Sequence, residues 1–143
     1  MGSVIDRKFY RIRRNNISQA LFLLQSERLL PVETASLNLG IAIPEALQAV
    51  QPEKRPQVLQ PTFQQLLSDL PVDVILWKPD VLFDPMWNID VLKLLLTVGR
   101  NRRIYILWPG TIDEAILEYS EPGCADYYRF DINKYVDAYI VMK

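Results

Sequence analysis

The short apolar run VDVILW, residues 72–77, leads into a polar loop, which is where a nucleotide hydrolase holds its magnesium ion. A strand of that kind needs a carboxylate at its end to hold the metal through water. Here Trp77 and Lys78 occupy that point, and neither offers an oxygen ligand. Asp80 and Asp84 follow several residues later, where they would point elsewhere. We therefore expect no bound magnesium, no cofactor and no ATP turnover, and we predict that the chain is not an enzyme.

A phosphate-binding loop is also missing near the start of the chain. Such loops follow the pattern GxxxxGK[ST], because glycines let successive backbone N–H groups converge on an anion at a helix N-terminus. The corresponding turn is expected at RNNIS, residues 14–18, and there is no glycine between Ser3 and Leu39. Two interpretations stay open for Arg13 and Arg14. Either they hold an anion with the helix start, or Ser18 caps a helix beside solvated arginines.

Composition excludes several kinds of chemistry. The 143 residues are 50% hydrophobic and carry a formal net charge of -1, so they suit one domain with no global preference for nucleic acid or membrane. The absence of histidine excludes Ser-His, Cys-His and zinc-finger sites. The single cysteine, Cys124, cannot form an internal disulfide. No apolar run approaches the roughly 20 residues of a membrane span, so we expect a cytoplasmic protein without a membrane partner.

Strands and helices are predicted to alternate along the chain. Hydrophobic spacing predicts strands at residues 8–14, 34–43, 72–77 and 102–108, and helices at residues 17–30, from Pro44, from Thr62 and at residues 89–101. The stretch 51–61 contains three prolines and is predicted to be an irregular connector inside a single domain. Residues 115–143 are predicted to form two or three short strands.

This alternation indicates a three-layer α/β fold. We expect a mostly parallel sheet with flanking helices, and C-terminal strands that add antiparallel edges or a hairpin. Ligands of such sheets bind beyond the carboxyl ends of the strands, so the loops after Arg14, Trp77 and Trp108 are the candidate ligand sites.

Several short motifs occur in an order that resembles a known family. The motifs are VLFDP from Val81, RNR from Arg100, WPG from Trp108 and EPG from Glu121. In this order they resemble the small BrxF-like P-loop proteins of type 3 BREX bacteriophage-defence systems. The resemblance covers about residues 37–130 and implies a sheet like that of a P-loop NTPase, in a bacterial antiviral system.

The chain departs from that family at the residues that would do chemistry. The glycine-rich loop is absent, Trp77 replaces the acidic strand end, and Cys124 stands where the family's tract usually has a histidine. The resemblance therefore implies a degenerate, catalytically inactive subunit. Its role would be to bind the other protein subunits of a defence complex, and an oligomer is compatible with that role.

Two arginine clusters are candidate sites for nucleic acid or a protein partner: Arg11, Arg13 and Arg14 in the first, and Arg100, Arg102 and Arg103 in the second. Cations neutralise phosphates and neighbouring rings can stack on bases, so the alternative function is a nucleic-acid-binding accessory protein. The first cluster could instead be a solvated strand face or a site for an acidic protein. The second could stabilise a helix dipole, or reach a nucleotide bound by a neighbouring subunit.

Met86 and Trp87, next to the polar Asn88, are a third candidate surface. Methionine and tryptophan are enriched at protein interfaces. We expect these two side chains to form an exposed anchor for a protein partner.

Overall fold

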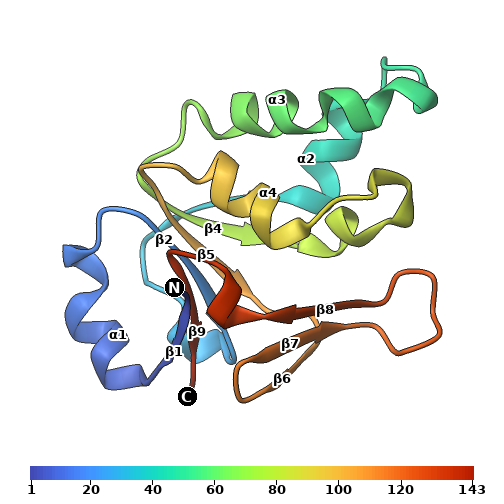
Figure 1. Ribbon diagram of the computed structural model, residues 1–143. Coiled ribbons are helices and arrows are strands. Elements are labelled where there is room, and N and C mark those ends of the chain that lie inside the picture. Colours follow the sequence, from blue (N-terminus) through green and yellow to red (C-terminus); the bar gives the residue numbers. More distant parts are fainter.

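A parallel six-stranded sheet forms the centre of the protein, and the computed structural model describes all residues 1–143 (Figure 1). Its strands are β1 (Ser3–Ile5), β2 (Ala20–Leu24), β3 (Ala35–Asn38), β4 (Asp73–Trp77), β5 (Arg103–Leu107) and β9 (Ala138–Val141). They lie in the order β1-β9-β2-β5-β4-β3, and every neighbouring pair is parallel. The predicted α/β class with a mostly parallel sheet and flanking helices is confirmed.

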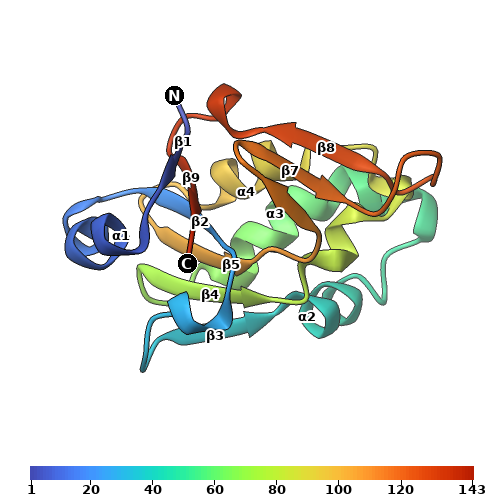
Figure 2. The same ribbon diagram turned by 90° about the horizontal axis from the view of Figure 1, so that it is seen from below.

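The two faces of this sheet are covered differently (Figures 1 and 2). One face packs against three helices, α2 (Leu39–Ala46), α3 (Arg55–Leu67) and α4 (Val91–Val98), and against a separate antiparallel sheet. That small sheet consists of β6 (Thr111–Asp113), β7 (Ile116–Tyr119) and β8 (Tyr128–Asp131). On the other face the only α-helix is α1 (Arg7–Arg13). None of the helices is long and apolar enough to cross a bilayer.

Strand β2 overturns the predicted helix at residues 17–30. All five residues of the strand are buried, with Leu21 and Leu23 in the core on the helix side and Phe22 and Leu24 in the core on the α1 side. A central parallel strand is apolar on both faces, and a short run of this kind cannot be distinguished from a buried helix by periodicity. The residues after it form only a short 3-10 helix, η2 (Glu27–Leu29).

Helix α1 overturns the predicted strand at residues 8–14. The Asp6 side chain caps the helix by accepting a hydrogen bond from the Phe9 N–H at 2.7 Å. Only Tyr10 is buried, and its hydroxyl donates to the Leu29 carbonyl at 2.7 Å. The alternation that suggested a strand reflects no buried face, because Phe9 and Ile12 are 45% and 61% exposed.

Two further boundaries differ from expectation around the prolines. Helix α2 begins before Pro44, so the strand predicted at residues 34–43 ends at Asn38. Residues 51–61 are not irregular, since they form the 3-10 helix η3 (Pro52–Lys54) and the first half of α3. Helix α3 continues through Pro61 because the sequence on both sides of it supplies buried positions four residues apart, at Leu59, Phe63 and Leu67.

The middle of the chain was predicted correctly. Strand β4, helix α4 and strand β5 lie within the expected ranges. Asp90 caps α4 by accepting from the Lys93 N–H at 3.1 Å, and the helix ends at Gly99. Two 3-10 helices, η4 (Pro79–Phe83) and η5 (Pro85–Trp87), connect β4 to α4.

The C-terminal strands form antiparallel hairpins, one of the two predicted alternatives, but they add no antiparallel edge to the large sheet. Strands β6 to β8 pair antiparallel as a small sheet of their own. After the 3-10 helix η6 (Ile132–Lys134), β9 enters the large sheet parallel to both β1 and β2. The chain therefore ends inside the main sheet.

The fold predicts a large effect from truncating the centre of β2. Phe22 is fully buried and its ring packs on Tyr10, Tyr105 and Tyr139. We expect Phe22→Ala to lower the free energy of unfolding by about 3–5 kcal/mol, through lost transfer energy and the cavity left behind. Urea denaturation measures this. The control Val32→Ala, at a position 85% exposed, should stay within about 0.5 kcal/mol of the parent protein, and equal effects would place residues 20–24 outside the core.

Candidate functional site

A hollow at the carboxyl ends of β4 and β5 occupies the place where parallel sheets bind ligands. Its volume is about 220 Å³. The residues that line it come from η2, from the ends of β4 and β5, and from the loops that follow: Glu27, Leu76, Trp77, Lys78, Pro79, Asp80, Leu107, Trp108 and Pro109. Two of the three predicted ligand loops, after Trp77 and Trp108, therefore meet here.

The third loop of the hollow follows β2, and not Arg14 as predicted. After Leu24 the chain reaches β3 with only η2 in between, so no α-helix follows this strand. Residues 25–34 contain no glycine. The Ser26 hydroxyl accepts from the Arg28 N–H at 3.3 Å, which closes the turn on itself. The loop thus contributes the Glu27 carboxylate to the hollow and no cradle of backbone N–H groups, an arrangement that repels phosphate.

The end of β4 offers no metal ligand either. Trp77 is half-buried at the strand end, and Lys78 follows in the left-handed conformation with φ at 55°. Asp80 starts the 3-10 helix η4, and the Tyr119 hydroxyl lies 3.4 Å from its carboxylate. No group of three or more Cys, Asp or Glu side chains in the protein is arranged to hold a metal ion.

Trp108, at the end of β5, connects the two sheets. Its indole N–H donates to the Glu118 carbonyl at 3.1 Å, and its ring meets Phe83 and Phe130 edge to face. Phe83 in turn stacks on Tyr119 with ring centroids 4.0 Å apart. The side of the hollow formed by Trp108 therefore packs against the small sheet.

The opposite ends of β4 and β5 carry the one salt bridge of the protein. Two N–H groups of Arg103 donate to the two carboxylate oxygens of Asp73, each at 2.7 Å. The Tyr105 hydroxyl donates to the same carboxylate at 2.6 Å. The Arg103 hydrogen bonds lower the pKa of Asp73 below its ordinary value, and Tyr105 acts in the same direction against the effect of burial. Burial, with the Asp73 hydrogen bond, raises the pKa of Tyr105 to about 12.

This network joins the two predicted arginine clusters. Arg14 donates to the Tyr105 hydroxyl at 3.1 Å, and Arg103 also donates to the Ile17 carbonyl at 3.0 Å. The Asn101 N–H donates to the Gln19 side chain at 2.8 Å, so the turn before β5 lies against the turn before β2. The sequence signal for this contact is weak, because most of the partners are backbone carbonyls and a hydroxyl from distant segments.

Arg102 is likewise engaged inside the fold. Its guanidinium donates to the carbonyls of Leu67, Leu70 and Pro71, which follow the end of α3. It therefore caps the C-terminus of α3, whereas the sequence had suggested a role at the end of the preceding helix, α4. Of the six arginines singled out, only Arg11, Arg13 and Arg100 are fully exposed.

The Met86 and Trp87 pair is exposed only in part. Met86 is 42% exposed, whereas Trp87 is 7% exposed and its indole N–H donates to the Val81 carbonyl at 2.8 Å. Trp87 was wrongly expected to be an exposed anchor, because η5 turns its ring toward the core. Both residues line a hollow of about 200 Å³ beside Pro44 and Arg55.

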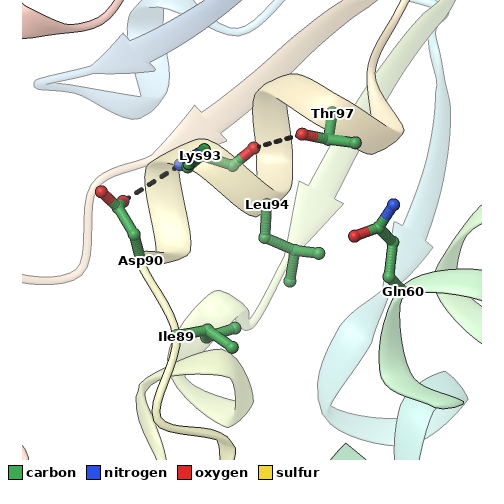
Figure 3. Close-up of a pocket in the computed structure, with 6 residues that line it drawn as sticks. All are labelled: Gln60, Ile89, Asp90, Lys93, Leu94 and Thr97. Carbon is green, nitrogen blue, oxygen red and sulfur yellow. Dashed lines mark hydrogen bonds between the residues drawn. The ribbon is translucent and has the colours of Figure 1, made fainter. Parts of the chain in front are cut away.

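A further hollow of about 220 Å³ lies between α3 and the start of α4 (Figure 3). Two of its polar side chains are already paired within the fold. Asp90 accepts from the Lys93 N–H and from the Tyr135 hydroxyl, the latter at 2.7 Å, and Thr97 donates to the Lys93 carbonyl at 2.8 Å. The other two, the Gln60 amide and the Lys93 ammonium, come from different helices and make no hydrogen bond.

Comparison with known proteins gives no relative for this chain: no family model, no curated protein and no solved structure matches it.

The Asp73 network makes a prediction about stability and pH. We expect Asp73→Asn to lower the free energy of unfolding by about 1–3 kcal/mol at neutral pH, because Arg103 and Tyr105 lose a charged acceptor. The folded-state pKa of Asp73 lies below its unfolded value. Its stabilisation is therefore present above the unfolded value and is lost as the pH falls through the folded value, so parent and variant should converge in acid.

Urea denaturation across the acid range provides the measurement. Asp113→Asn is the matched control, since Asp113 is exposed and makes no salt bridge. Equal effects of the two substitutions at neutral pH would show that the network does not stabilise the fold.

Proposed function

We propose that this chain is a catalytically inactive interaction subunit of a bacterial anti-phage assembly of the type 3 BREX kind, with a sheet derived from that of P-loop NTPases. The proposed lack of catalytic activity rests on one observation: no α-helix lies between β2 and β3. The connection between these two strands holds no α-helix N-terminus and no glycine, and it adds the Glu27 carboxylate to the hollow instead. A triphosphate would meet negative charge where it needs backbone N–H groups.

The strand order supports the relation to P-loop NTPases. Strand β5 lies between β2 and β4, as in those P-loop NTPases in which an added strand separates the phosphate-loop strand from the metal-binding strand. The ordered motifs from Val81 to Gly123 support the link to the defence family. In this interpretation the rings of Trp77 and Trp108 occupy the space where an active relative would hold its metal ligand and its triphosphate.

A second candidate function, nucleic-acid binding, is favoured by one observation. The two arginine clusters meet in space through the contacts of Arg103 and Asn101 with residues 15–19. The exposed Arg11, Arg13 and Arg100 would then supply the phosphate contacts.

Thermal unfolding with ATP and magnesium tests the proposal. We expect the Tm to stay unchanged, because Lys78 is the only cation at the hollow and the carboxylates of Glu27 and Asp80 oppose it. A ligand at 100 times its Kd would add about 2.7 kcal/mol, which is roughly 5–10 °C for a chain of this size. Such a shift, abolished by Lys78→Ala at the hollow, would refute the absence of nucleotide binding. Co-purification with co-expressed neighbouring defence proteins is expected, and its failure would count against the interaction role.

Fluorescence anisotropy with a labelled 30-base-pair DNA duplex separates the second function from the first. If the three exposed arginines each neutralise one phosphate, affinity should fall about 40-fold from 50 to 200 mM salt. It should fall by a comparable factor in the triple variant of Arg11, Arg13 and Arg100 to glutamine. Arg129→Gln, on the small sheet, is the exposed control. Absence of binding at low salt would eliminate this function.

A further inference from the structure

Helix α1 presents an unusually dense set of unpaired cations. Residues 6–14 hold five cations and one carboxylate, and that carboxylate, Asp6, already caps the helix. The only salt bridge of the protein joins Arg103 and Asp73, so no cation of α1 has an internal ion-pair partner. Arg7, Lys8, Arg11 and Arg13 are all exposed.

The same helix exposes apolar surface among these charges. Tyr10 is the only residue of α1 that points into the core. Phe9 and Ile12, three residues apart and therefore neighbours on the helix surface, are 45% and 61% exposed. An apolar pair ringed by cations suits a partner surface that is itself acidic and partly apolar.

The small sheet has the opposite character. Residues 111–131 hold six carboxylates and a single cation, Arg129. Asp113, Glu114 and Glu121 are exposed, and no carboxylate of this segment forms a salt bridge. Its partly exposed tyrosines, Tyr119, Tyr127 and Tyr128, supply apolar surface between the charges.

Burial and nearby carboxylates raise the pKa of three tyrosine hydroxyls on this sheet. Burial raises the pKa of Tyr119, and the carboxylates of Asp80 and Asp126 raise it further. Burial also raises the pKa of Tyr128, with Asp84 and Asp126 adding to it. The hydrogen bond of Tyr127 to the Glu118 carboxylate raises the pKa of that hydroxyl as well.

The small sheet begins near the middle of the molecule and extends away from α1 (Figure 1). Figures 1 and 2 both place α1 at the left and the loop between β7 and β8 at the right, with the large sheet between them. One chain therefore cannot satisfy its own cations with its own acidic sheet. A second copy can, because the net charge of -1 lets copies approach without strong overall repulsion.

We propose that copies of this chain associate head to tail, with the outer face of α1 in one copy docked on the acidic sheet β6–β8 of the next. The contact would place Phe9 and Ile12 against the exposed tyrosine rings, and the flanking cations against carboxylates such as Glu114 and Glu121. Such a heterologous contact leaves one complementary surface free at each end, so it forms a ring where the rotation closes and a filament where it does not. This inference is independent of nucleotide binding.

Sedimentation equilibrium at low and high salt tests the proposal with charge-reversed variants. The parent protein, a 16.6 kDa chain, should associate beyond a dimer in low salt. The association constant should fall about tenfold or more in 0.5 M salt, because the charges are exposed. The double variant Lys8→Glu with Arg11→Glu and the double variant Glu114→Lys with Glu121→Lys should each be monomeric.

Mixing the two double variants is the decisive measurement. In the mixture, the unchanged acidic sheet of the first variant can dock on the unchanged α1 of the second, so at least a heterodimer should form, which a loss of folding could not produce. In the parent background, Ile12→Ser should weaken association about tenfold, while the control Val32→Ser, at an exposed site outside α1 and the small sheet, should leave it unchanged. A monomeric parent in low salt, or a mixture that stays monomeric, would overturn the proposal.

Discussion

Strand β2 is buried on both faces, and the remaining architecture depends on that burial. Leu21 and Leu23 pack beneath the helices, while Phe22 and Leu24 meet the α1 side. The strand lies between β5 and β9, so the last strand of the chain must enter the sheet between β1 and β2 to complete it. Both faces of β2 must be covered, and α1 contributes to the cover of one face through Tyr10, its one buried residue.

This constraint also explains the character of the hollow above the strands. A strand that continues into a helix presents backbone N–H groups to a ligand, but β2 continues into a short 3-10 turn and then into β3. The neighbouring strand ends, Trp77 and Trp108, supply rings instead of carboxylates. Trp108 binds the small sheet through its indole N–H and its aromatic contacts. The edge of the sheet where ligands usually bind is here largely a packing surface, in keeping with the proposed interaction role.

The arginines divide into two groups with different physical roles. Arg14, Arg102 and Arg103 are held by a hydroxyl, by carbonyls and by Asp73, and so they connect segments that are far apart in the sequence. The exposed cations of α1 form no salt bridge, and neither do the carboxylates of the small sheet, of which Glu118 accepts a hydrogen bond from Tyr127. Exposed cations therefore gather on α1 and exposed carboxylates on the small sheet, and this opposite charge is the basis for the proposed association.

The α/β class, the strand β4, the helix α4 and the strand β5 could be predicted from the sequence, because these elements combine clear hydrophobic patterns with local stop signals. The lack of a GxxxxGK[ST] pattern and of an acid at Trp77 can also be read directly from the residues. Folding was needed to show that residues 20–24 form a central strand and that residues 7–13 form a helix. The first run is apolar without a period, and the second depends on one buried side chain and one capping carboxylate. The hydrogen bonds of Arg102 and Arg103 could not be predicted either. Their partners come mainly from residues 15–17 and 67–73, which only folding brings beside β5.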